Sequence, residues 1–282
     1  MHLVDNLNPV LVHLGPLQIH WYGVMYALAF IIGYYLIRYL APKRRVPLDA
    51  NGVADLTLYL VAGVLLGGRL GYVLFYNLPY YLRHPAQIVA VWDGGMSFHG
   101  GLIGVIVAGL LFSWKSRIPF WSLTELVVPV APVGLFLGRI GNFINGELWG
   151  RPSNVPWAMI FPRAPLVHGI MVPRHPSQLY EAILEGLVLF TILWILAQKP
   201  RPHGLLLGTF LIFYGLFRCF VEFFRQPDPQ LGYIGGFITM GQILSIPMVL
   251  IGIGLIVWAV RRSRSNSEER LPVNPPHIGH RA

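Results

Sequence analysis

The chain has 282 residues, of which 55 % are hydrophobic and only 12 % charged, and its mean hydropathy is +0.58. This composition is typical of a membrane protein and excludes an ordinary soluble domain. A formal net charge of +9 could indicate a nucleic-acid partner, but much of the positive excess lies in short segments that follow apolar stretches. We therefore expect no nucleic-acid partner. The single cysteine, Cys219, excludes an internal disulfide framework and is expected to pack in an apolar interior.

Apolar stretches long enough to cross a bilayer, which takes roughly 20 residues per helix, occur along the whole chain. Seven can be placed, near residues 19–38, 54–76, 97–114, 121–140, 177–197, 204–224 and 239–260. The sequence therefore predicts an all-α polytopic membrane protein with seven transmembrane helices in one domain over residues 1–262. A longer external segment at 141–176 separates the fourth and fifth helices. The polar, proline-bearing tail at 263–282 is predicted to be disordered.

The positions of the cations predict the orientation of the chain. Lysines and arginines follow the first, third, fifth and seventh stretches: Lys43, Arg44, Arg45, Lys115, Arg117, Lys199, Arg201, Arg261, Arg262 and Arg264. Short cytoplasmic segments are enriched in these residues, and the segment before Trp21 has none. The N terminus is therefore expected outside and the C terminus inside, which an odd number of spans requires.

Polar side chains gather at the predicted outer ends of the spans. They are His20, Tyr22 and Tyr26 on the first; Arg69 on the second; Ser97 and His99 on the third; Arg139 and Asn142 on the fourth, followed by Glu147 and Arg151; Arg174, His175, Gln178 and Glu181 on the fifth; and Arg218, Glu222 and Arg225 on the sixth. The spacing of the last three, i, i+4 and i+7, places them on one helix face.

An ionised side chain inside a span costs about 2.5 to 3.5 kcal/mol on insertion scales. We therefore expect Arg69, Arg139 and Arg218 to face an internal polar cavity. Two simpler arrangements stay open: Arg218 pairs with Glu222, or the arginines extend to the lipid headgroups. Guanidinium matches phosphate oxygens with a rigid fork of donors, which favours recognition of a phospholipid headgroup.

Other kinds of chemistry have little support in the sequence. There is no HExxH or CxxC, no P-loop and no GxSxG, so neither a metal nor another cofactor is expected. His99 is a candidate general base near neutral pH. Local sequence equally allows it to be a histidine that hydrogen-bonds across helices.

Six motifs together resemble the bacterial prolipoprotein diacylglyceryl transferases. They are HWYGVMY at 20–26, DGGMSFHGGLIG at 93–104, GRIGNFINGELWGR at 138–151, RHPSQLYEAILEG at 174–186, VEFFRQPD at 221–228 and MGQILSIP at 240–247. The resemblance covers about residues 15 to 262. The motif at 138–151 is close to a signature of that family.

The resemblance implies a multi-pass enzyme of the bacterial inner membrane, acting in lipoprotein biosynthesis with its active site toward the periplasm. Such enzymes transfer the diacylglyceryl group of phosphatidylglycerol to the lipobox cysteine of a prolipoprotein signal peptide, forming a thioether and releasing glycerol 1-phosphate. The site residues of that family fall here on Tyr22, His99, Arg139, Asn142, Glu147, Gly150, Arg218 and Glu222.

Residue chemistry suggests a role for each group. Arg139 and Arg218 would hold the phosphate and offset the charge that develops on it as the glycerol C3–O bond breaks. The thiol, with a reference pKa of about 8.5, needs a base; His99 is the first candidate and Glu147 the second. The remaining groups are expected to bind substrate or to hold the arginines: Tyr22, Tyr26, Asn142, Gly150 and Glu222.

Two other classes remain as alternatives. A lipid-binding transporter or scaffold with an outer-leaflet anion site would also collect polar groups within a bundle, although a transporter normally needs a polar path through its whole length. An intramembrane hydrolase would need a nucleophile beside a base, and no such arrangement is evident in the sequence.

Overall fold

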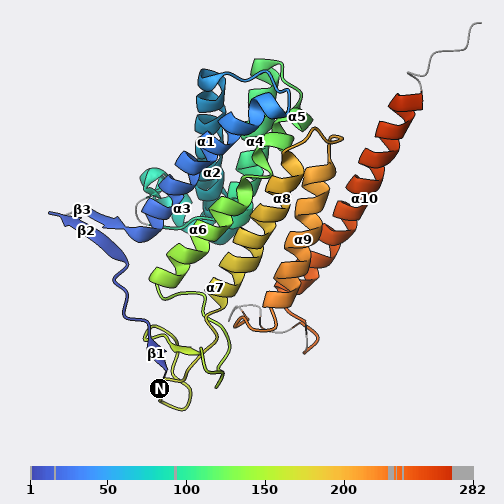
Figure 1. Cartoon of the computed structure of the whole chain (residues 1–282). Coiled ribbons are helices and arrows are strands. Elements are labelled where there is room, and N and C mark those ends of the chain that lie inside the picture. The colour runs from blue at the N-terminus through green and yellow to red at the C-terminus, as the bar shows by residue number, and fades with distance from the viewer. Residues whose placement is uncertain are drawn as a thin grey trace, which may run out of the picture.

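A computed structural model of the chain describes residues 2–15, 17–91, 94–227, 232, 234–236 and 238–268. The fold is a bundle of helices in which α10 runs along one edge beside α9 (Figure 1). The helices are α1 (Trp21–Lys43), α2 (Ala50–Tyr76), α3 (Leu78–Arg83), η1 (Pro85–Val89), α4 (Phe98–Ser116), α5 (Phe120–Val127), α6 (Ala131–Ile144), α7 (Ser177–Glu181), the π-helix η3 (Ala182–Val188), α8 (Leu189–Ala197), α9 (Leu205–Val221) and α10 (Met240–Glu268). The remainder of the predicted tail, 269–282, lies outside the described residues.

Two small sheets lie outside the helical bundle. Strand β1 (Leu3–Val4) pairs in parallel with β4 (Met159–Ile160). Strands β2 (Val10–Leu14) and β3 (Leu17–His20) form an antiparallel hairpin, which projects from the bundle immediately before α1 (Figure 1). The N-terminal residues therefore bind to the segment between α6 and α7.

Length and composition identify five helical segments that could cross a membrane: α1, α2, α4, the continuous segment Ser177–Ala197 formed by α7, η3 and α8, and Met240–Ser263 of α10. The bent pair α5 and α6 makes a sixth if counted as one span, and α9 is a shorter apolar helix of 17 residues. A polytopic helical protein is thus confirmed. The count of seven spans and the orientation stay predictions.

The fourth predicted span differs from the single helix expected at 121–140. Helices α5 and α6 meet at an angle of 45° across residues 128–130. Pro129 lies in this break and Pro132 in the first turn of α6. Because proline lacks an N–H and its ring clashes with the carbonyl four residues earlier, it interrupts a helix. The bend redirects α6, which carries Arg139 and Asn142.

Glycines bring α2 and α4 into direct backbone contact. A Cβ on Gly67 would lie 2.4 Å from the carbonyl oxygen of Gly100, and one on Gly104 would lie 2.0 Å from that of Gly63. These glycines recur every four residues on each helix, which is the small-residue pattern that allows close packing within membranes. The glycine-rich motif after residue 93 therefore serves helix packing at least at Gly100 and Gly104.

A buried ion pair joins the basic segments at one end of the bundle. Arg44, just after α1, donates to Glu125 Oε2 on α5, and Glu125 Oε1 accepts from the backbone N–H of Gly204 at 3.0 Å. Arg44 also donates to the carbonyl oxygen of Lys199. The Glu125 carboxylate thus ties the segments after α1 and before α9 to α5.

Replacing Arg44 with alanine is expected to destabilise the protein by about 3 to 5 kcal/mol, because it leaves a buried carboxylate without its cation. The melting temperature in detergent measures the effect. Arg38→Ala, which removes an exposed arginine from the same helix, is the matched control. Equal melting temperatures for the two variants would contradict a stabilising role for the pair.

Arg69 does not face a polar cavity as expected. Its guanidinium donates to the carbonyl oxygens of Ile88 at 2.8 Å, Gln87 at 2.6 Å and Gly94 at 2.5 Å, and the residue is buried. These bonds satisfy carbonyl groups of η1 and of the segment between η1 and α4. Arg69 therefore holds a loop in place, and its cost in the membrane is offset by carbonyl groups.

Candidate active site

Glu181, at the end of α7, is the centre of an ion-pair network at the other end of the bundle. Its Oε2 lies 2.5 Å from Arg139 Nε of α6 and 3.0 Å from Arg218 Nη1 of α9. Its Oε1 lies 3.5 Å from Arg225 Nη1, just beyond α9. The Glu181 side chain is fully buried. One carboxylate therefore holds three guanidinium groups, which come from α6, from α9 and from the segment after α9.

Two further carboxylates balance the charge of the arginines. Arg218 Nη2 lies 2.5 Å from Glu222, and Arg218 Nη1 lies 3.8 Å from Glu185 of η3. Both oxygens of the buried Glu185 lack a hydrogen-bond partner among the described residues. The expected pairing of Arg218 with Glu222 is confirmed, but it belongs to a network with three arginines and three glutamates.

A chain of side-chain amides extends the network toward Glu147. Arg139 Nη1 donates to Asn142 Oδ1 at 3.3 Å, and Asn142 Nδ2 donates to Glu147 Oε1 at 2.8 Å. Asn145 donates to the same carboxylate oxygen at 3.2 Å, and Gln178 donates to the Glu147 carbonyl at 2.6 Å. Glu147 is thus held as an acceptor that orients Asn142.

The side chains of Arg139 and Arg218 are partly exposed, whereas that of Glu181 is not. Side-chain exposure is 17 % for Arg139 and 14 % for Arg218, against 0 % for Glu181. A guanidinium has five N–H donors, so both residues retain donors for an anion that approaches from the open side.

The segment between α6 and α7 closes the outer end of this network. Gly150 N–H donates to the His175 carbonyl at 2.8 Å, and Arg151 donates through Nε to the Arg225 carbonyl at 2.9 Å. A Cβ at Gly150 would lie 2.6 Å from the carbonyl oxygens of His175 and Phe224. Only glycine fits this close approach. Gly150 therefore seats the segment against the residues that follow α9.

His175 and Arg174 secure the far side of the same segment. Burial lowers the pKa of His175, so the ring stays neutral, and its Nδ1 lies 3.1 Å from the Tyr180 hydroxyl. Arg174 is buried and donates to the Pro165 carbonyl at 3.0 Å. Both side chains stabilise the loop and do not contact the central arginines through a hydrogen bond within the described residues.

Tyr22 approaches the network from α1 through a contact with α6. A Cβ at Gly141 would lie 2.8 Å from Tyr22 Cδ2. The Tyr22 hydroxyl lies 3.3 Å from that of Tyr26, one turn further along α1. Gly141 thus makes room for the ring beside the helix that carries Arg139 and Asn142.

Adding a methyl group at Gly141 is therefore expected to displace Tyr22. Overpacking of this kind costs about 1 to 3 kcal/mol, and transferase activity should fall with it. Gly138→Ala is the matched control, because no atom lies within 4 Å of a Cβ built one turn earlier on the same helix. Melting temperature and activity are measured for both. If Gly138→Ala is as damaging as Gly141→Ala, displacement of Tyr22 is not the cause.

His99 lies apart from the bonded network. It is exposed in the first turn of α4, beside the Phe98 ring, with 5.7 Å between ring centres. Within the described residues it forms no hydrogen bond or ion pair with the arginines. The structure therefore joins Arg139, Asn142, Glu147, Arg218 and Glu222 directly, with Tyr22 and Gly150 adjacent by packing. Tyr26 is linked only through Tyr22, and Cys219 is free and half-buried.

A hollow of about 380 Å³ opens beside Glu147. It lies between the N-terminal arm and the segment after α6, and is lined by Pro9, His20, Asn145, Gly146, Glu147, Trp149 and Arg163. The hollow places Glu147 between the arginine network and an open space.

The sequence analysis placed Glu181 and Arg225 at the same end of the spans as the other polar residues but did not name them as site residues, and it missed Glu185 altogether. The spacing of the two glutamates, one turn apart in an apolar span, was the available indication, because it mirrors Arg218 and Glu222. Which carboxylate holds which arginine depends on how α6, α7 and α9 pack. Local spacing does not contain that information.

These features define a polytopic membrane protein with a buried arginine–glutamate network that is partly open at one end of the bundle. The sequence matches the prolipoprotein diacylglyceryl transferase family over residues 9–258. The chain belongs to that family.

Curated relatives agree with this assignment. Proteins named phosphatidylglycerol–prolipoprotein diacylglyceryl transferase are similar to the chain in three organisms. The identity is 55 % over 259 residues in Bordetella avium (92 % of this chain and 97 % of the relative), 54 % over 257 residues in Geobacter sulfurreducens (91 % and 97 %) and 52 % over 268 residues in Francisella tularensis subsp. novicida (94 % and 98 %). The similarity therefore extends over nearly the full length of this chain and of each relative.

Proposed function

We propose that this protein transfers the diacylglyceryl group of phosphatidylglycerol to the lipobox cysteine of a prolipoprotein, forming a thioether and releasing glycerol 1-phosphate. The observation that carries the proposal is the pair Arg139 and Arg218, held on one oxygen of Glu181 with both guanidinium groups partly accessible. Such a pair is suited to a phosphate, whose oxygens accept several charge-assisted hydrogen bonds. Membership of the family identifies the phosphate-bearing substrate.

The chemistry assigns distinct tasks to the two substrates. The cysteine thiolate attacks C3 of the diacylglyceryl group, the C3–O bond breaks, and the electron pair leaves with the phosphate of glycerol phosphate. Arg139 and Arg218 stabilise the negative charge that develops on this leaving group. Glu181 and Glu222 fix the arginines in advance, so little reorganisation is needed during the reaction.

We assign His99 as the general base that removes the proton from the cysteine thiol. Glu147 already accepts hydrogen bonds from Asn142 and Asn145, which supports an orienting role instead of a basic one. His99 is exposed at the start of α4 and is free to meet a thiol carried by the second substrate. A neutral imidazole is a competent base near neutral pH.

Loss of this base should be partly compensated by alkaline pH. For His99→Gln we expect a fall in transfer of about 10² to 10⁴ at pH 7. Raising the pH above the reference thiol pKa of about 8.5 ionises the peptide cysteine without help and should recover a large part of the rate. Rates are measured from pH 6.5 to 9.5 alongside Glu147→Gln. If the His99 variant shows no recovery while the Glu147 variant does, the assignment of the base is reversed.

We place the enzyme in the bacterial inner membrane as a seven-span protein, with α9 and the bent α5–α6 pair each counted as a span. The network end faces the periplasm and the basic end faces the cytoplasm. This placement is supported by the cations of the basic end, because lysine and arginine are retained on the cytoplasmic side. The lipid enters sideways from the outer leaflet and glycerol phosphate leaves to water.

One incubation tests the transfer itself. Phosphatidylglycerol labelled separately in an acyl chain and in the headgroup glycerol is supplied with a lipobox peptide and with its Cys→Ser counterpart. A transferase yields acyl-labelled peptide and headgroup-labelled glycerol phosphate in equal amounts, with the cysteine peptide only. Glycerol phosphate release without peptide labelling would indicate a hydrolase, and unchanged lipid would indicate a transporter or scaffold.

A further inference from the structure

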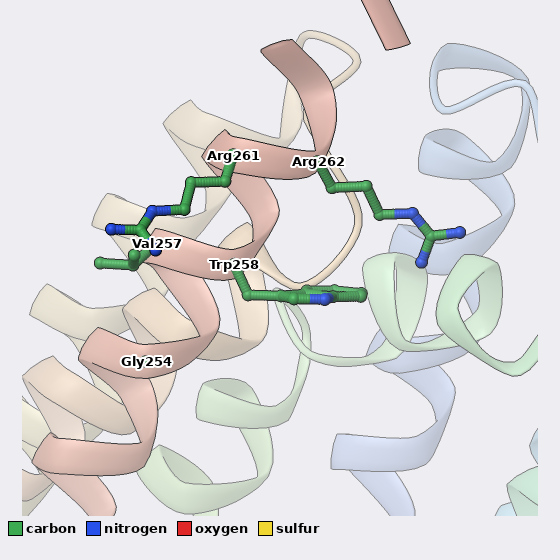
Figure 2. Close-up of a pocket in the computed structure, with 5 residues that line it drawn as sticks. All are labelled: Gly254, Val257, Trp258, Arg261 and Arg262. Carbon is green, nitrogen blue, oxygen red and sulfur yellow. The ribbon is translucent and has the colours of Figure 1, made fainter. Parts of the chain in front are cut away.

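A hollow of about 640 Å³ lies on α10 at the end of the bundle opposite the network, lined by Gly254, Val257, Trp258, Arg261 and Arg262. Figure 2 shows Arg261 and Val257 on one side of the helix, and Trp258 with Arg262 on the other. The proposed transfer reaction uses none of these residues. Their position at the basic end places them at the level of the inner headgroups.

The two arginines of the hollow differ in how they are held. Arg262 Cζ lies 5.3 Å from the centre of the Trp258 ring, and this ring in turn lies 5.5 Å from that of Trp121. Arg261 is exposed. Neither guanidinium forms an ion pair with a carboxylate among the described side chains. Arg261 is therefore a cation available to a ligand.

An apolar stripe leads from Arg261 along α10. Ile246, Leu250, Ile253 and Val257 are all exposed large hydrophobic residues. Their spacing to one another and to Arg261, of three or four residues, places all five on one helix face. The basic group is thus continuous with a track for a hydrocarbon chain.

Gly254, which has no side chain, leaves a notch in the helix surface beside this stripe. No atom lies within 4 Å of a Cβ built there, whereas a Cβ at the neighbouring Gly252 would lie 2.7 Å from the Gly208 carbonyl. Gly252 is needed for close packing of α10 on α9, but Gly254 is not. A glycine without a packing partner leaves room for a ligand at the helix surface.

The surroundings of the hollow favour an anion. Burial lowers the pKa of His203, and the positive charges of Arg44 and Arg262 lower it further. Glu125, the nearby buried carboxylate, is already bound by Arg44. Among the described side chains, no carboxylate is therefore left to pair with Arg261 or Arg262.

We propose that this hollow binds an anionic phospholipid, with its phosphate on Arg261 and one acyl chain along Val257, Gly254 and Leu250. A free phosphate would use the arginine but not the stripe, and a zwitterionic lipid would use the stripe but gain less from the charge. The site is distinct from the one that holds the substrate phosphate.

Photo-crosslinking tests the proposal with the full chain in phosphatidylcholine nanodiscs. The probe is phosphatidic acid with a diazirine on one acyl chain, and adducts are quantified on the peptide that covers residues 246–258. We expect unlabelled phosphatidic acid to compete, whereas phosphatidylcholine and glycerol phosphate should not. Equal competition by phosphatidylcholine would overturn the proposal, since it would indicate ordinary lipid contact.

Two variants and a control separate charge from shape. Arg261→Ala should reduce the adducts about fivefold, the loss expected for one basic residue at an anionic surface. Gly254→Phe should reduce them by filling the notch, while Lys115→Ala, which removes another exposed cation at this end, should not. Transferase activity, which these residues do not carry, reports that each variant is folded. If Arg261→Ala forms as much adduct as the wild type while its transferase activity is normal, the proposal is wrong.

Discussion

Glu181→Ala is expected to abolish measurable transfer, because it removes the group that holds three arginines in place. Arg139, Arg218 and Arg225 would then repel one another in a buried site. Removing one partner from a buried ion-pair network typically costs about 3 to 5 kcal/mol. The melting temperature should therefore fall together with the rate of diacylglyceryl transfer to a lipobox peptide.

Glu181→Gln separates the two effects. The amide keeps the shape and one acceptor oxygen, so more stability should remain than in Glu181→Ala, while the rate should still fall because the arginines are no longer fixed by charge. Glu185→Gln is the matched control on the same face, since the oxygens of Glu185 accept no hydrogen bond within the described residues. If the Glu185 variant loses as much activity as the Glu181 variant, the central role of Glu181 is contradicted.

Arg139→Ala is expected to lower kcat for transfer by about 10² to 10³, the usual cost of removing one group that stabilises charge in a transition state. The rate should fall more than the affinity for phosphatidylglycerol, because the developing charge on the leaving phosphate exceeds that of the bound lipid. Thioether peptide and glycerol phosphate are followed in parallel.

Arg139→Lys and Arg38→Ala provide the comparison. Lysine keeps the charge but loses the fork that reaches Glu181, Asn142 and a phosphate together, so only partial activity should return. Arg38→Ala removes an exposed arginine outside the network and should leave transfer unchanged. A rise in KM with an unchanged kcat in Arg139→Ala would show that this arginine binds the lipid without acting on the leaving group.

The sequence was informative wherever the helix period and the membrane limit the choices. Arg218, Glu222 and Arg225 were expected on one helix face; α9 ends at Val221, so Arg225 lies beyond the helix, yet both arginines contact Glu181. The cost of charge in a membrane correctly indicated that Arg139 and Arg218 have polar partners. Arg69 has polar partners too, but they are backbone carbonyls of η1 and the loop after it instead of the expected polar cavity, and no local sequence pattern indicates them.

The parts that could not be predicted depend on packing between distant elements. The bend between α5 and α6 follows from Pro129 and Pro132, but its effect on the position of Arg139 requires the neighbouring helices. Gly150 was named through a motif, yet its physical reason, close contact with the carbonyls of His175 and Phe224, appears only in three dimensions. The pairing of β1 with β4 joins residues too far apart in sequence for any periodicity to indicate.

A double-mutant cycle on Arg139 and Arg218 tests the central claim most directly. The rate constant for transfer is measured for the wild type, Arg139→Ala, Arg218→Ala and the double variant. Groups that act as a unit on one phosphate give strongly non-additive losses, so the double variant should be no more than about tenfold slower than the worse single variant. If the fold-reduction in the double variant equals the product of the two single reductions, the arginines act on separate events. That result would contradict the claim that both bind the leaving phosphate.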